Sequence, residues 1–272
     1  MKSPGLSVCA LGSGSKGNAV FISGGDSAVL VDAGLSGIEL ERRMAAKGLS
    51  PDMLSAVVVT HEHTDHIKGA GILSRRFGIP LYLNQKTLQA ASKKLGAIDG
   101  AMNFKCGVPF HIGDLKIDPF SISHDAADPS GFTLEHGGVK MGLATDLGVA
   151  THLVKTHLKG CSLLYLEANH DPDMLNNGPY PWYLKQRVKS RLGHLSNAAA
   201  GDLVNDIRGN SLCHVILAHL SHENNTPEKA LQTFHERLDT HSLQVEVAMP
   251  HAPGTLISIF PENKDAFSSF LE

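Results

Sequence analysis

The chain lacks the features that mark disulfide-rich and membrane proteins. It has four cysteines among 272 residues and no C-x-x-C pair, which argues against a disulfide framework and favours reduced thiols in the cytoplasm. No apolar stretch approaches the roughly 20 residues that cross a bilayer. The first residues do not have the pattern of a signal peptide. These absences predict a cytoplasmic protein without a membrane partner.

The sequence also lacks an excess of positive charge. Its formal net charge is −3 with histidines neutral, so bulk electrostatics do not favour nucleic-acid binding. The densest local basic group is Lys185, Arg187, Lys189 and Arg191, and such groups are more often solvated helix faces than binding sites. Histidine is abundant instead, with 16 residues. Several of these histidines need a chemical explanation.

Short apolar runs alternate with helical patterns along the whole chain. Two strand-rich stretches, near residues 7–31 and 108–145, each have helical segments beside them. Because a sheet must bury its apolar face, this order predicts an α/β fold with two mixed sheets packed together and helices outside, in a four-layer αββα sandwich. No linker or repeat interrupts the chain, so residues 1–272 are expected to form a single domain.

The stretch 169–193 departs from this alternation. It contains three prolines and the only tryptophan of the chain. We predict an irregular loop or lid with a short helix there, and long loops in compact domains are more often functional than not.

The strongest chemical signal is the run H-E-H-T-D-H at residues 61–66, directly after the apolar segment 56–60. On an extended chain, His61 and His63 are two residues apart and project to the same side. Asp65 and His66 are expected on the following turn, aimed at a different point. Imidazole and carboxylate suit zinc and other first-row divalent ions. The run therefore predicts metal binding, with a solvated histidine-rich loop as the alternative.

A pair of metal ions needs further ligands, which should lie at strand ends where loops meet. His124, Asp146 and His219 each follow an apolar run. Asp146 could bridge two cations, or it could cap the helix that follows. Each of the three would alone be an ordinary polar residue, but together with the 61–66 run they complete two ligand sets.

These residues carry a resemblance to the metallo-β-lactamase-fold hydrolases, and among them to the YycJ/WalJ group of small exonucleases. The matching segments are residues 11–18 (LGSGSKGN), 31–34 (VDAG), 60–66, 123–132, 145–148 (TDLG), 166–171 (LEANHD), 193–196 (GHLS) and 217–224. They occur in the expected order over nearly the whole chain. The resemblance implies the αββα fold already expected from the strand pattern.

The resemblance also implies two divalent ions, Zn²⁺ or Mn²⁺, bridged by Asp146 and a hydroxide. The ligands implied for one ion are His61, His63, His124 and Asp146, and for the other Asp65, His66, Asp146 and His219. Asp32 would orient a ligand histidine, or be a simple turn residue. His194 would contact the scissile phosphate and protonate the leaving oxygen, or merely flank a helix. Asp65 and His194 are thus the expected catalytic residues.

Two ions about 3.5–4 Å apart suit in-line attack at phosphorus. Only 73 positions separate Asp146 from His219, too few for the large inserted domain of the β-CASP nucleases. The resemblance thus implies a compact 5′ to 3′ exonuclease that acts on DNA. One alternative is a small-molecule hydrolase of the same fold, either a cyclic phosphodiesterase or a glyoxalase-II-like thioesterase. Another is a non-catalytic metal-binding or scaffolding protein.

The glycine-rich segment 12–18 (GSGSKGN) needs a separate interpretation. It lacks the Lys-Ser/Thr ending of a P-loop and does not match G-x-G-x-x-G, so nucleotide-fold interpretations fail. It is either a tight turn near the metal cleft or a nest of backbone N–H groups that contacts phosphate. His222, Glu223 and Asn224 could also line a substrate path.

Overall fold

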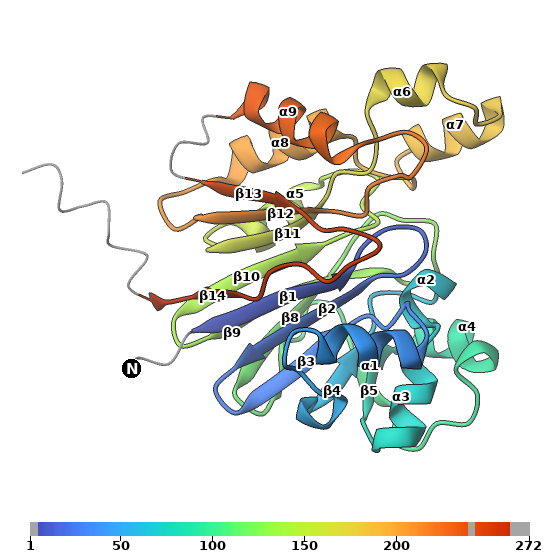
Figure 1. Cartoon of the computed structure of the whole chain (residues 1–272), viewed down its shortest axis with the longest axis vertical. Helices are drawn as coiled ribbons and strands as arrows, with labels where there is room; N and C mark the ends of the chain where they lie inside the picture. Colours follow the sequence, from blue (N-terminus) through green and yellow to red (C-terminus); the bar gives the residue numbers. More distant parts are fainter. Residues whose placement is uncertain (1–4, 239–242, 262–272) are drawn as a thin grey trace, which may run out of the picture.

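The computed structural model describes residues 5–238 and 243–261, and two seven-stranded sheets form its centre (Figure 1). The first sheet contains, in spatial order, β14 (Ile257–Ile259), β1 (Leu6–Gly12), β2 (Ala19–Gly24), β3 (Ser27–Val31), β4 (Ala56–Val58), β5 (Leu81–Asn84) and β6 (Met102–Phe104). The second contains β13 (Gln244–Val247), β12 (His214–Ala218), β11 (Leu163–Glu167), β10 (Val139–Ala144), β9 (Ser130–His136), β8 (Leu115–Ser121) and β7 (Phe110–Ile112). Both sheets mix parallel and antiparallel pairs.

Helices cover the outer face of each sheet. The first sheet is accompanied by α1 (Gly37–Ala45), the short 3-10 helix Pro51–Met53, α2 (Thr64–Ile67), α3 (Ala70–Phe77) and α4 (Gln85–Leu95). The second is accompanied by α5 (His152–Leu158), α6 (Pro172–Asn177), α7 (Trp182–Lys189), α8 (Asn197–Ile207) and α9 (Pro227–Arg237). The expected αββα arrangement is therefore confirmed. No helix in the described ranges is long and apolar enough to cross a membrane.

Three apolar clusters hold these layers together. The central cluster lies between the sheets and includes Val31 of the first sheet with Phe132 and Tyr165 of the second. The other two join each sheet to its helices, as Leu40 of α1 does on one side and Phe234 of α9 on the other. Strands with a cluster on each face are buried along their whole length, which explains the continuous apolar runs in the sequence.

Parallel strands bring several loops to one edge of the molecule. In the first sheet β3, β4, β5 and β6 run parallel, and in the second β10, β11, β12 and β13 do so. The carboxyl ends of parallel strands lie at the same edge of a sheet, which is where ligands bind in open α/β sheets. In Figure 1 this edge is on the right, between α2 and α7.

One local expectation was only partly right. The 169–193 segment contains two helices, α6 and α7, where an irregular loop or lid with one short helix was expected. The Oδ1 atom of Asp171 accepts hydrogen bonds from the amides of Asp173 and Met174, and Pro172 occupies the first helical position, so a cap starts α6. Asp65 and His66 lie on the turn that was expected after His63, and this turn is the one-turn helix α2.

Candidate metal centre and active site

The structure brings all seven predicted ligands together at this edge. His61, His63 and His124 can place one nitrogen each within 4.8 Å of one another. Asp65, His66 and His219 form a second such group. Asp146 joins a third with His61 and His66, and a fourth with His219, Glu167 and His194. We call the seven predicted ligands the His/Asp cluster.

Asp146 occupies the junction of the cluster. Its Oδ2 atom lies 3.2 Å from Nε2 of His66. Its Oδ1 atom lies 3.6 Å from Nε2 of His124 and 3.5 Å from Nδ1 of His219. One carboxylate therefore faces both histidine groups.

The backbone is strained at this edge. Among the described residues, the only non-glycine residues with positive φ are Asp32, Asp146 and His219, at 61°, 57° and 56°. Left-handed backbone costs an L-residue roughly 1–2 kcal/mol. Each of the three follows a strand end, after β3, β10 and β12. Strain of this kind persists where surrounding structure enforces it, and it concentrates at functional sites.

Asp32 holds the first-sheet side of the cluster. Its Oδ1 accepts a hydrogen bond from the amide of Thr60 at 2.8 Å. Its Oδ2 accepts from Oγ1 of Thr60 at 2.8 Å and from Nδ1 of His66 at 2.7 Å. Because the carboxylate can only accept, Nδ1 of His66 carries the proton and Nε2 is directed toward Asp146. The expected orienting contact of Asp32 is present.

Glu167 holds the second-sheet side, although no role was expected for it from the sequence. Its Oε1 accepts hydrogen bonds from Nδ1 of His194 and of His219, each at 2.8 Å. Its Oε2 accepts from the amides of Leu147 and Leu195 at 2.8 and 2.9 Å. Glu167 ends the buried strand β11. The signal that pointed to Asp146, a carboxylate at the end of an apolar run, was thus also present here.

Four buried polar atoms of the cluster are suited to binding a cation. Nε2 of His61, His124 and His219 and Oδ2 of Asp146 are buried without any hydrogen-bond partner. A buried polar atom without a partner costs about 1–3 kcal/mol. Four such atoms in one cluster mark a place for a group that accepts lone pairs. A donor set of imidazole nitrogens and carboxylate oxygens fits a divalent first-row ion.

Burial and neighbouring charges shift the pKa values of histidines in the cluster in opposite directions. Burial and repulsion from His66 hold the pKa of His61 well below its usual value, so this imidazole is neutral and able to bind a metal. Burial acts the same way on His219, but the charge of Asp146, the nearby carboxylate of Asp65 and the hydrogen bond with Glu167 outweigh it and raise the pKa of His219 to about 10. Metal binding would therefore release a proton from this histidine.

Comparison with known proteins places the chain in a family. Residues 12–164 match the metallo-beta-lactamase superfamily. The chain belongs to this superfamily. It is 38% identical over 237 residues to the exodeoxyribonuclease YycJ of Bacillus anthracis, covering 86% of this chain and 90% of the relative. It is 38% identical over 251 residues to the exodeoxyribonuclease WalJ of Streptococcus pneumoniae serotype 2 (strain D39), covering 91% and 93%.

Solved structures agree with this assignment of the fold. The metallo-beta-lactamase fold protein YhfI of Bacillus subtilis superposes with a TM-score of 0.72 at 18% identity, covering 92% of this chain and 99% of that one. The chain is accordingly a hydrolase of the metallo-beta-lactamase superfamily, and its His/Asp clusters are suited to metal binding.

In this superfamily member, α6 and α7 lie above the cluster edge (Figure 1). A cavity of about 400 Å³ extends from His194 and is lined also by His170, Asn176, Lys189 and Ser196. His194 is partly exposed, with 22% of its side chain accessible. It therefore stands between the buried cluster and an open space beneath the two helices.

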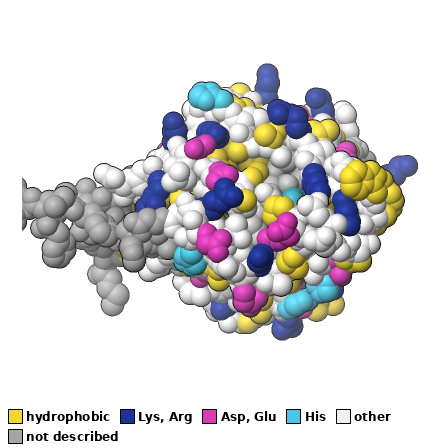
Figure 2. Space-filling model, turned by 90° about the horizontal axis from the view of Figure 1, so that it is seen from above, with side chains coloured by type: hydrophobic (Ala, Val, Ile, Leu, Met, Phe, Trp, Pro, Cys, Tyr) yellow, Lys and Arg dark blue, Asp and Glu magenta, His cyan; other side chains and the backbone are white. Residues whose placement is uncertain are grey.

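Figure 2 looks down on this helical side of the molecule. Lys and Arg side chains are spread across it among acidic ones, and an apolar patch lies at its right-hand edge, on the side of α7. Trp182 and Tyr183 of α7 are 73% and 74% exposed. Arg187 and Lys189 of α7 line cavities together with His194, and the two exposed aromatic rings lie at the other end of the same helix.

Proposed function

We propose that the protein is a dinuclear metal-dependent phosphodiesterase that removes nucleotides from DNA in the 5′ to 3′ direction. The observation that carries this proposal is the pairing of a two-group cluster around Asp146 with a histidine, His194, held beside it by Glu167. The two 38% identical relatives named exodeoxyribonucleases support DNA as the substrate.

The proposed ligands follow from the two groups that share Asp146. The first ion would be held by His61, His63, His124 and Asp146, and the second by Asp65, His66, Asp146 and His219. When bound, two divalent ions lower the pKa of a water molecule and neutralise charge on the phosphoryl oxygens. Either Zn²⁺ or Mn²⁺ suits these nitrogen and oxygen donors.

His194 is the proposed proton donor. Its Nδ1 donates to Oε1 of Glu167 at 2.8 Å, so Nε2 is left for the substrate. The ring can give a proton from Nε2 to the leaving oxygen. Burial works against ionisation of Glu167, but the charge and hydrogen bond of His194 outweigh it and lower the pKa of this carboxyl to about 2. Glu167 therefore stays ionised and orients the ring.

Asp65 is the second proposed catalytic residue. Its Oδ2 lies 3.5 Å from Nε2 of His66 and 3.7 Å from Nε2 of His219, and its side chain is 25% exposed. A partly exposed carboxylate at the mouth of the cluster can accept a hydrogen bond from the attacking water and align it with the phosphorus. Nδ2 of the Asn18 side chain donates a hydrogen bond to this Oδ2 at 3.3 Å and helps to fix the carboxylate.

The surface around His194 supports a polymeric, negatively charged substrate. The net charge of the chain is −3, so attraction to DNA must be local. The stretch from Trp182 to Arg191 supplies exposed aromatic rings together with Lys and Arg side chains. Proteins that bind single strands combine cationic grooves with aromatic residues on which bases stack.

A substrate panel tests the proposal. The purified protein with Mn²⁺ or Zn²⁺ is given 5′-phosphorylated and 5′-hydroxyl DNA, bis-p-nitrophenyl phosphate and S-lactoylglutathione. We expect stepwise shortening of DNA from the 5′ end that is lost in Asp65→Ala and His66→Ala. Turnover of the thioester with inert DNA would instead establish the small-molecule hydrolase, and no turnover of any substrate would favour a non-catalytic role.

A variant of His194 tests the assigned roles. His194→Ala should keep its metal content but lose about 10²- to 10⁴-fold in DNA turnover, the usual contribution of a general acid. His152→Ala is the matched control, because His152 is an exposed histidine on α5. Loss of metal from His194→Ala, measured by elemental analysis, would show that His194 is a ligand and not a proton donor.

A further inference from the structure

A separate cavity lies beside the loop that follows His219. Its volume is about 260 Å³. Three segments surround it: residues 14–16, 220–227 and 247–251. His222, which could line a substrate path by its position after His219, is part of this wall. The reaction steps proposed above give this cavity no role.

The cavity wall is bonded to the His/Asp cluster at two points. Leu220, which lines the cavity, directly follows the predicted ligand His219, and the amide of His219 donates to Oγ of Ser13 at 2.7 Å. Gly14, which follows Ser13, also lines the cavity, and its backbone amide donates a hydrogen bond to Oδ1 of Asn18 at 2.8 Å. Nδ2 of Asn18 in turn lies 3.3 Å from Asp65. The cavity therefore begins within one or two residues of the cluster, about 4–7 Å along the chain.

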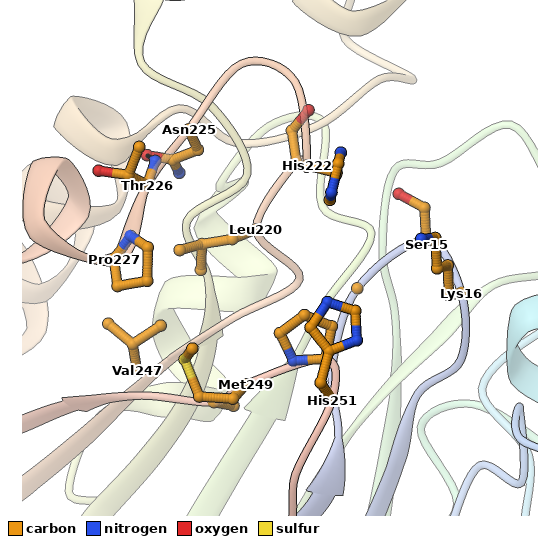
Figure 3. Close-up of a pocket in the computed structure, with 14 residues that line it drawn as sticks. Ser15, Lys16, Leu220, His222, Asn225, Thr226, Pro227, Val247, Met249 and His251 are labelled. Atoms are coloured by element: carbon orange, nitrogen blue, oxygen red, sulfur yellow. Dashed lines mark hydrogen bonds between the residues drawn. The ribbon is translucent and has the colours of Figure 1, made fainter.

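The lining has two chemically different sides, which Figure 3 shows apart. The apolar side chains of Leu220, Pro227, Val247 and Met249 gather on one side. Lys16 and His222 stand on the other, with His251 between the two sides. Lys16, His222 and His251 are all exposed. An apolar floor with a cationic and imidazole rim matches a flat heterocycle that is attached to a phosphate.

We propose that this cavity binds the base of a nucleotide that flanks the scissile phosphate. The inference rests on the proposed nuclease function and adds to it a site for the base. Its volume is below the roughly 300–1,000 Å³ of pockets that enclose drug-sized ligands, so it suits one base and not a longer piece of substrate. Lys16 on the rim can meet the neighbouring phosphate as a point charge.

Base binding here requires that the nucleotide leaves the duplex. A base inside a stacked helix cannot enter a cavity in the protein surface, and extruding it costs a few kcal/mol, less where it is already unpaired. The apolar floor can offset part of this cost by covering the face of the base. The enzyme should consequently act faster on single-stranded or frayed ends than on blunt duplex ends.

Substrates without a base test the cavity directly. Single-stranded DNA is prepared with a tetrahydrofuran abasic residue at the first, second or third position from the 5′ end, and kcat/KM of the first cleavage is measured. We expect one of the two positions that flank the cleaved bond to lose about tenfold when its base is removed, in keeping with the contribution of one bound base. The same oligonucleotides with 2-aminopurine at that position should change in fluorescence on binding in EDTA, which gives a readout without cleavage.

Two variants connect that loss to the cavity. In Met249→Ser, the ratio of intact to abasic kcat/KM should fall from about ten toward one. Val247→Thr keeps the volume of the side chain and should lower the ratio in the same direction. Met102→Ser is the matched control: Met102 is 49% exposed and Met249 41%, but Met102 lies on β6 at the opposite edge of the first sheet from β1 and β14. The control should keep the full ratio.

The outcomes separate the two proposals. DNA cleavage without any dependence on a flanking base would overturn the base site and leave the nuclease function standing. A base dependence that is unchanged in both Met249→Ser and Val247→Thr would place recognition elsewhere and overturn it as well. Absence of DNA cleavage would overturn the nuclease function, and the base site with it.

Discussion

The two sheets contribute to the His/Asp cluster in different ways. The first sheet supplies four predicted ligands from the single segment 61–66, which follows β4. The second supplies His124, Asp146 and His219 from three loops, after β8, β10 and β12. One half of the site is thus a property of six consecutive residues, and the other half exists only when a sheet has formed and its strand ends lie side by side.

Each half is oriented by one buried carboxylate, and the two carboxylates differ in reach. Asp32 is bonded to one predicted ligand, His66, and to Thr60. Glu167 is bonded to a predicted ligand, His219, and also to the proposed proton donor, His194. Neutralising Asp32 should therefore weaken only metal affinity. Neutralising Glu167 should weaken both metal affinity and turnover.

A change of Asp146 should have the largest effect, because its carboxylate faces both halves of the site. In Asp146→Asn the carboxylate that faces buried imidazoles is replaced by a neutral amide. We expect loss of bound metal and a fall in DNA turnover larger than the roughly 10- to 100-fold that follows loss of a ligand's hydrogen-bond partner. Elemental analysis and the DNA assay measure the two effects. Asp52→Asn, at an exposed position, is the control, and an Asp146→Asn protein that retains both ions would argue against a bridging role.

Asp32→Asn and Glu167→Gln sharpen the comparison. Both should weaken metal affinity by about 10- to 100-fold, because each removes the carboxylate that fixes a ligand imidazole. Adding excess metal should restore the turnover of Asp32→Asn. It should leave Glu167→Gln impaired, since the carboxylate that orients His194 is lost as well. Titration of metal against kcat for both variants makes the measurement.

Two results would contradict this distinction. If excess metal restores Glu167→Gln completely, Glu167 acts only through His219 and the assigned role of His194 fails. If it restores neither variant, Asp32 does more than orient His66. Circular dichroism of both proteins checks that the sheets have formed before the kinetic comparison is made.

The same contrast explains what could be predicted from the sequence. The 61–66 segment could be identified by spacing alone, because ligands two residues apart on an extended chain share a side. His124, Asp146 and His219 could be proposed only as polar residues after apolar runs, and their grouping depended on the family resemblance. Glu167 has the same local signal, but nothing in the sequence tells which buried carboxylate will meet which histidines 27 and 52 residues away.

The 169–193 segment shows another limit of local patterns. Residues 169–193 were expected to be mainly irregular because of their prolines, yet Pro172 starts α6 and Pro181 precedes α7. A proline at a helix start costs no helical hydrogen bond, because the first N–H groups of a helix have no partner within it, whereas a proline inside a helix disrupts it. The cavity between residues 14–16, 220–227 and 247–251 could not be predicted at all, because its walls come from three distant segments.

The smallest effect is expected from a change of Thr60, whose hydroxyl donates a hydrogen bond to Asp32 in the first half of the site. Oγ1 of Thr60 donates to Asp32 at 2.8 Å and lies 3.0 Å from Nδ1 of His61, so Thr60→Val removes a link between the orienting carboxylate and a predicted ligand. We expect a loss of about 1–3 kcal/mol in the free energy of unfolding, as for a buried polar group left without its partner, and only a few-fold loss of activity at saturating metal. Thermal or urea unfolding measures the first, and Thr60→Ser, which keeps the hydroxyl, should recover most of it.

The second half offers no equivalent change, because Oε2 of Glu167 is held by the backbone amides of Leu147 and Leu195. A side-chain substitution cannot remove those donors. Leu195→Val should therefore affect packing but keep the hydrogen bond from the backbone amide of residue 195 to Glu167. Its loss of activity at saturating metal should not exceed that of Thr60→Val. A larger loss in Leu195→Val would mean that the second half depends on side-chain packing, and the contrast between the two carboxylates would need to be drawn differently.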